Sequence, residues 1–123
     1  MSAAAGGGSV VPFPGRVPNN SWQIGFAREE LSRILDLYGR MVAAGHWRDY
    51  GLSFHPDVAI FAAFAAFRRA ADRPQVRVEK RPALRGRQGM WTLFGEHGQI
   101  LKRGHELAGV LAPVERRLLK AVD

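Results

Sequence analysis

The sequence predicts an α+β domain in which two helices cover one face of an antiparallel meander sheet. Two segments with helical spacing of apolar residues, 27–45 and 104–122, lie on either side of a region in which apolar and polar residues alternate. A helical repeat puts apolar side chains on one stripe, whereas a period of two puts them on one face of a strand. Because each of these faces must be buried, we expect the helices to pack against the sheet.

The first helix is predicted over residues 27–45. Its apolar side chains recur at helical spacing and fall within about a third of the helix circumference. They are Leu31, Ile34, Leu35, Tyr38, Met41 and Val42. The opposite side carries two acid–base pairs at i, i+4 spacing, Glu29 with Arg33 and Asp36 with Arg40, which suit a solvent-facing surface. Gly45 follows the last apolar position, where a helix commonly ends.

Short alternating segments predict the strands of the sheet. They are residues 22–26 before the first helix, and 50–55, 75–80, 90–94 and 99–102 after it. We interpret 46–49 as a connector and 81–89 as a polar loop, and 95–98 has the length of a loop that closes a hairpin. In the segment 75–80, valines alternate with Arg77 and Glu79, which are expected to point outward. Segments in this order indicate a meander.

Residues 58–69 fit either a helix or a strand. Five alanines and the spacing of Ile60, Phe61, Phe64 and Phe67 favour a helix. The two-residue connection from the preceding strand favours a hairpin instead. The properties of the residues alone leave both alternatives open.

The last helix begins near residues 104–105 and runs almost to residue 123. Leu107, Leu111, Val114, Leu118 and Val122 keep helical phase throughout this segment. Pro113 interrupts it, and because proline lacks an N–H and clashes with the preceding turn, we expect a kink or a break there.

We expect a single domain, 21–123, preceded by a disordered tail, 1–20, whose Gly-, Ala- and Pro-rich composition cannot bury enough apolar surface to stay ordered. The longest apolar run, 58–67, is about half as long as a membrane-spanning helix, and no secretory signal is recognisable. These features predict a cytoplasmic protein that does not contact a membrane. The absence of cysteine excludes disulfides and thiolate metal sites.

The positive charge is concentrated in one stretch of the chain. The formal net charge is +7, and residues 68–87 hold eight basic and two acidic side chains, a net +6. Arginine pairs with phosphate oxygens through two parallel hydrogen bonds, and an aromatic ring beside such a cluster can stack on a base. The candidate nucleic-acid-binding residues are therefore Arg68, Arg69, Arg73, Arg77, Lys80, Arg81, Arg85, Arg87, Trp91, Lys102 and Arg103.

Two other interpretations of this charge remain open. The basic face or an unpaired sheet edge would also suit an acidic protein partner, which predicts an interaction adaptor. Alternatively, the charges serve solubility and protect sheet edges from pairing with other chains. The segment 47–50 is either packing at the end of the first helix or a further recognition surface. Among these interpretations, the concentration of charge favours nucleic-acid binding.

The sequence predicts neither an enzyme nor a cofactor or metal site. The four histidines, His46, His55, His97 and His105, have no metal-ligand spacing and no recognisable nucleophile beside them. The segment 86–89 contains two glycines but is too short for a phosphate-binding loop and leads into a strand.

The run 31–45, followed by Trp47-Arg48-Asp49-Tyr50, resembles a family of small alphaproteobacterial proteins known only as a domain of unknown function. Further matching segments are 67–70, 73–74, 77–80, 87–90 and 100–108. The resemblance covers nearly everything from 22 to 120 and implies membership without an activity. In the family pattern an apolar strand precedes Phe67, which implies that 58–69 is a strand, in a sheet of about five to six strands. The repeated Ala-Ala-Phe unit in 62–67 is expected to lengthen or bulge that strand.

Overall fold

In the computed structural model of the protein, the described residues are 23–66 and 73–122, with the backbone alone described for 119–122. The predicted tail, 1–20, therefore lies outside the described residues. The predicted site residues Arg68 and Arg69 lie outside them as well.

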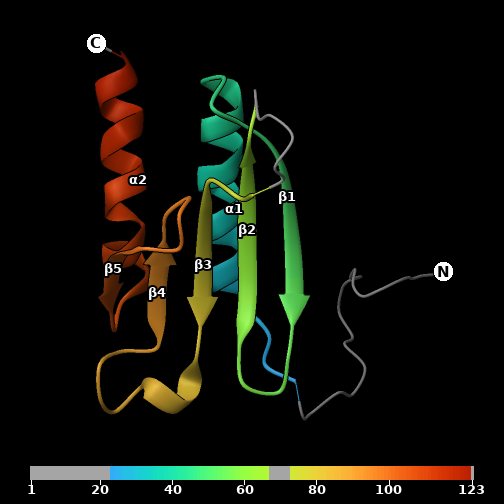
Figure 1. Cartoon of the computed structure of the whole chain (residues 1–123), viewed down its shortest axis with the longest axis vertical. Helices are drawn as coiled ribbons and strands as arrows, with labels where there is room; N and C mark the ends of the chain where they lie inside the picture. Colours follow the sequence, from blue (N-terminus) through green and yellow to red (C-terminus); the bar gives the residue numbers. More distant parts are fainter. Residues whose placement is uncertain (1–22, 67–72, 123) are drawn as a thin grey trace, which may run out of the picture.

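An antiparallel sheet forms the centre of the fold, and the predicted α+β class is confirmed. Its five strands lie in chain order, β1-β2-β3-β4-β5 (Figure 1). The elements are helix α1 (Arg28–Ala43), strands β1 (Trp47–Phe54), β2 (Ala59–Ala65) and β3 (Val76–Lys80), the short 3-10 helix η1 (Pro82–Leu84), strands β4 (Trp91–Phe94) and β5 (Ile100–Gly104), and helix α2 (Leu107–Val122). Each strand is antiparallel to its neighbours, as expected for a meander.

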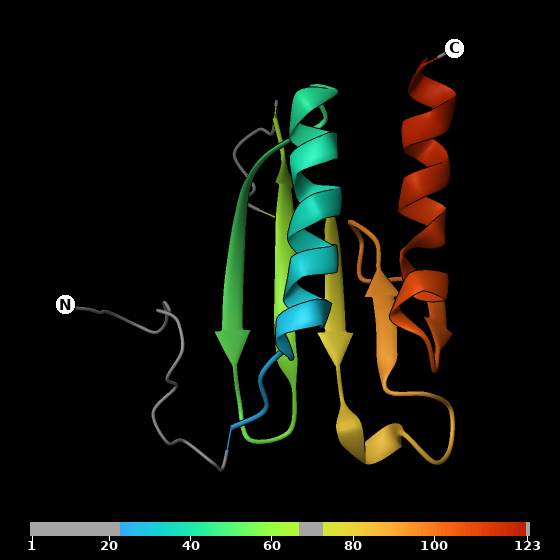
Figure 2. The same ribbon diagram turned by 180° about the vertical axis from the view of Figure 1, so that it is seen from behind.

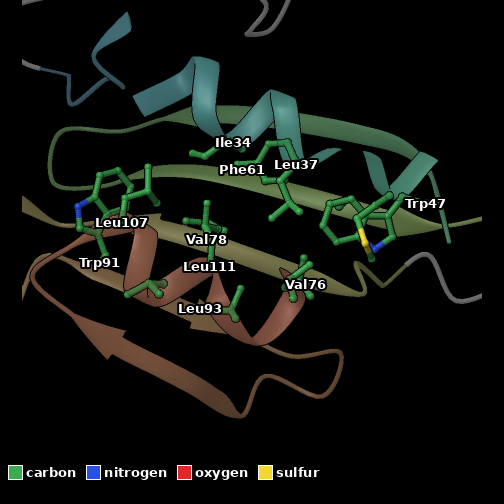
Figure 3. Packing of buried hydrophobic residues seen from close by; sticks show 14 residues of the cluster. Ile34, Leu37, Trp47, Phe61, Val76, Val78, Trp91, Leu93, Leu107 and Leu111 are labelled. Atoms are coloured by element: carbon green, nitrogen blue, oxygen red, sulfur yellow. The ribbon is translucent and has the colours of Figure 1, made fainter. Parts of the chain in front are cut away.

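Both helices pack on the same face of the sheet. Figure 2 shows α1 in front of β2 and β3, with α2 beside β4 and β5. In Figure 3, Ile34 and Leu37 of α1 point onto the sheet beside Phe61, and the core extends from Trp47 at one end to Trp91 at the other. These residues are almost fully buried. The core therefore lies between one sheet face and the two helices.

The buried stripe of α1 is rotated from the predicted one. Leu37, which the periodicity did not select, is 2% exposed, whereas Val42, which it did select, is 40% exposed. The reason is that α2 lies beside this part of α1, where Arg40 Nη2 is 3.3 Å from Glu115 Oε2 of α2. Leu37, one turn before Arg40, is consequently covered on two sides.

The predicted strand before α1 is wrong over the described residues, since 23–27 form no strand. The chain is nevertheless held against the domain, because the Ile24 N–H donates a hydrogen bond to the carbonyl of His55 (2.8 Å). Phe26 stacks on Trp91, with 6.2 Å between ring centroids. Packing of alternate residues in an extended segment explains the period-two pattern without a strand.

The strand alternative for 58–69 is confirmed over its described part, because β2 pairs with both β1 and β3. Ala59 and Ala63 face the helices and are fully buried. The expected irregularity falls in β1 rather than in β2, at the register shift between Trp47 and Asp49. Residues 47–49, predicted to be part of a connector, thus begin β1.

Helix α2 contains Pro113 within a single helix, so of the two expected alternatives, a kink or a break, the break is wrong. Val110, Leu111 and Val114 are each 1% exposed. Packing of this apolar face on the sheet holds the helix together across the position at which proline cannot donate a hydrogen bond.

Candidate nucleic-acid interface

The fold divides the basic stretch into several parts. Strand β3 runs through the middle of it, with Arg73 before its start and Arg85 and Arg87 beyond its end (Figure 1). Five residues of extended chain span roughly 17 Å, so Arg73 lies far from the other two. The basic residues, although close together in the sequence, therefore do not form one continuous surface.

Lys80 belongs to the helix side of the sheet. Its Nζ donates hydrogen bonds to Glu30 Oε1 (2.7 Å) and to the carbonyl of Gly25 (2.9 Å). This ion pair ties the start of α1 to the end of β3. The prediction that Lys80 contacts a phosphate is corrected, because its ammonium already serves the fold.

Arg77 and Arg81 share the carboxylate of Glu79 on the opposite face. Arg77 Nε lies 2.9 Å from Glu79 Oε2, and Arg81 Nε lies 3.2 Å from Glu79 Oε1. Arg81 Nη1 also contacts Asp57 Oδ2 at 3.2 Å. Glu79 points outward as expected but is only 6% exposed, because the two arginines cover it. These four residues together carry no net charge.

Trp91 is a core residue and not a base-stacking ring. It is 2% exposed and stacks on Phe26. The prediction of a stacking role for Trp91 is therefore wrong, because its position in β4 turns the indole toward the helices. Trp47 is also buried, and its ring lies 6.1 Å from that of Tyr38, so it packs against α1.

Three exposed arginines lie at one end of the sheet, and we call this group the arginine end: Arg85, Arg87 and Arg103. Arg103 Nη1 donates a hydrogen bond to Gln88 Oε1 (3.3 Å), which joins β5 to the loop that carries the other two. None of the three forms an ion pair with a carboxylate within the described ranges 23–66 and 73–122.

Backbone contacts order the loop of the arginine end, residues 85–89. Gly89 has φ +96°, a conformation that side chains other than glycine rarely adopt. The N–H groups of Arg87 and Gly89 both donate to the carbonyl of Leu84 at 3.0 Å. Because Gly89 also lies directly against Gly104, the loop and the end of β5 form one unit.

Lys102 is separated from the arginine end. Successive residues of a strand point to opposite faces, so Lys102, opposite Leu93, and Arg103, opposite Thr92, diverge. Lys102 is exposed on the edge strand, on the side of the sheet that carries the helices. The sequence-based prediction, which placed both residues in one site, is corrected here.

Other features of the described chain offer weaker sites. A groove between α1 and α2 is lined by residues of both charges: Glu29, Ser32, Arg33, Asp36, Arg40 and Glu115. Arg40 bridges Asp36 and Glu115, and the three acidic and two basic residues of the lining leave the groove with a net charge of −1. Across the part of the chain that the structure describes, no cluster of histidine and acidic residues could hold a metal. No helix in that part is long and apolar enough to cross a membrane.

Fold and surface together define the protein as a small α+β domain, a five-stranded meander packed against two helices, with an arginine-rich end. The chain belongs to the family described as "Protein of unknown function (DUF2794)", whose sequence model matches residues 24–111. The match includes the whole sheet and all three residues of the arginine end. Neither a curated protein nor a solved structure matches the chain.

Proposed function

We propose that the protein is a non-enzymatic accessory protein that binds the phosphate backbone of a nucleic acid through the arginine end. The observation that carries this proposal is the location of Arg85, Arg87 and Arg103 at one end of the sheet, where they are exposed and form no ion pair with a described carboxylate. A planar guanidinium matches the geometry of phosphate oxygens, and clustered cations gain affinity by releasing counterions from the backbone.

The construction of the loop also supports a binding role. Its hydrogen bonds to Leu84 and the contact between Gly89 and Gly104 order the backbone before any ligand is bound. Ordering that is already present does not have to be imposed on binding, so more of the interaction energy appears as affinity. The arginines that the fold needs for its own ion pairs lie outside this group.

The test compares wild-type protein with a variant in which Arg85, Arg87 and Arg103 are all replaced by Ala. A matched control replaces Arg33, Arg116 and Arg117, three exposed arginines of the helices, and removes the same charge. Fluorescence anisotropy of labelled duplex and single-stranded DNA and RNA should show weaker binding for the first variant and nearly unchanged binding for the control.

An adaptor role is the second candidate, and one observation favours it. Strand β5 is an edge of the sheet, where Ile100 and Leu101 are 49% and 42% exposed beside Arg103. An extended acidic peptide could pair with this edge and contact the arginine. If no nucleic acid binds, titration with an acidic strand-forming peptide becomes the measurement of choice, and Arg103→Ala should weaken that binding.

A further inference from the structure

The face of the sheet opposite the helices carries a mixture of apolar, polar and charged side chains. Strand register assigns to this face Ser53, Ile60, Ala62, Arg77, Glu79, Thr92, Phe94, Ile100 and Arg103. Figure 1 views the sheet from this side, and no described helix or strand lies over it. Within the described ranges, this face is therefore open to a ligand.

Arg77 lies over an aromatic ring on this face. Its Cζ lies 4.2 Å from the centroid of the Phe94 ring. Its Nε is bonded to Glu79 Oε2 at 2.9 Å, and 31% of the side chain is exposed. The guanidinium is thus held by two contacts, with Phe94 and with Glu79, and part of the side chain reaches the surface.

Arg77 and Phe94 together form a surface that we call the platform, and it is continuous with the arginine end. Arg103 pairs with Thr92, which pairs with Glu79, and all three lie on the same face as Arg77. The row of Arg77 and Phe94 is two residues further along the strands, a distance of about 7 Å. A chain whose phosphates lie at Arg103 can therefore extend across the sheet toward Arg77.

We infer that the open sheet face binds unpaired bases of a single-stranded nucleic acid, with one base stacked on the Arg77 guanidinium. This inference rests on the proposed backbone binding at the arginine end and specifies its ligand. Arginine planes and aromatic rings stack on bases of single strands, whereas the bases of a duplex are already stacked on one another. Phe94 lies behind Arg77, and Glu79 holds its orientation, so the stacking plane exists before the ligand arrives.

The experiment measures binding of three labelled probes to the full chain: an oligothymidylate of about ten nucleotides, an abasic strand of equal length, and a duplex of equal length. The test variant is Arg77→Lys, which keeps the charge but loses the plane. Arg33→Lys, at an exposed position of α1, is the matched control. We expect Arg77→Lys to weaken oligothymidylate binding by about five-fold or more, to leave abasic binding unchanged, and Arg33→Lys to change neither.

Two further measurements guard against a folding defect in Arg77→Lys. Phe94→Leu removes the ring behind the guanidinium and should weaken oligothymidylate binding in the same direction. In the wild-type protein, the NMR signal of the Arg77 Nε–H should shift on addition of oligothymidylate and stay in place with the abasic strand.

The outcomes separate this inference from the proposed function. Equal affinity for the abasic strand and oligothymidylate would overturn base stacking on the platform and leave backbone binding in place. Unchanged oligothymidylate binding by both Arg77→Lys and Phe94→Leu would do the same. Preference for the duplex overturns the platform as well. Absence of binding to all three probes overturns both proposals.

Discussion

Gly89 and Gly104 meet backbone to backbone, so closely that a Cβ atom on Gly89 would lie 2.3 Å from the carbonyl carbon of Gly104. This contact fastens the loop of the arginine end to the last strand of the sheet. Gly86, in the same loop, has open space around it and does not have a positive φ.

Replacement of Gly89 by Ala should therefore destabilise the protein by about 2–4 kcal/mol, through backbone strain and the clash with Gly104. Gly86→Ala should change the free energy of unfolding by no more than about 0.5 kcal/mol. Urea unfolding of both variants is the measurement. Equal effects would mean that the loop does not pack on β5.

Leu37 should contribute more to stability than any position at the outer edge of the α1 stripe. Leu37→Ala removes a side chain that is 2% exposed and should cost about 2–5 kcal/mol. Val42→Ala, at a position that is 40% exposed, should cost well under half as much. A thermal or urea titration that reverses this order would contradict the observed rotation of α1.

Glu79 pairs with two arginines on the face of the sheet opposite the helices, so removing its charge should destabilise the protein. Glu79→Gln leaves Arg77 and Arg81 without their shared charge and should destabilise by about 1–3 kcal/mol, a range reduced for the partial exposure of both arginines. Asp57→Asn, at a largely exposed end of the same network, is the control and should be nearly silent. If both variants unfold at the same urea concentration as wild type, the network does not stabilise the sheet.

The pKa of Tyr38 makes the free energy of unfolding depend on pH in the alkaline range. Burial raises the pKa of Tyr38 above its ordinary value of 10.0, and the charge of Asp49 and the neighbouring Tyr50 raise it further. Its hydroxyl donates a hydrogen bond to the carbonyl of Arg48 at 2.7 Å. The folded state therefore keeps this proton longer than the unfolded chain does. The stabilisation is complete below pH 10 and is lost as the pH rises through the higher pKa of the folded state.

Urea unfolding between about pH 8 and pH 11 should accordingly show a decline in the free energy of unfolding above pH 10. Tyr38→Phe should be less stable at neutral pH, because the hydrogen bond is lost, and should show a shallower alkaline decline. Parallel pH profiles for the two proteins would show that Tyr38 is not the titrating group.

Local pattern predicted most of the fold, because periodicity reports directly which residues share a face. The succession of helix, meander and helix follows from that signal except at residues 58–69. The properties of those residues left helix and strand open, and only the family resemblance decided between them in favour of the strand. Leu37 and Val42 show the limit of periodicity. It defines how wide the apolar stripe is, but the position of α2, far along the chain, decides which edge of the stripe is buried.

The candidate site was less predictable than the fold, because charge in sequence says nothing of partners in space. Lys80 pairs with Glu30, which is distant in sequence, and Trp91 turns into the core because of its register in β4. The arginine end joins residues 85–89 to Arg103 through a close approach of two glycines. The sequence signal for that approach is slight: two glycines that end an arginine-rich loop and a strand.

The most direct test of backbone binding by the arginine end is the salt dependence of the affinity for labelled duplex DNA. The titration begins at about 50 mM salt, where backbone binders of this kind associate. If the arginine end contacts about three phosphates, log affinity should fall against log salt with a slope of about −2.7. The variant lacking Arg85, Arg87 and Arg103 should show a slope close to zero, and the helix-arginine control should keep the wild-type slope. Equal slopes for all three proteins, or no association at tens of micromolar protein, which lies within the range of typical non-specific affinities, would contradict backbone binding by the arginine end.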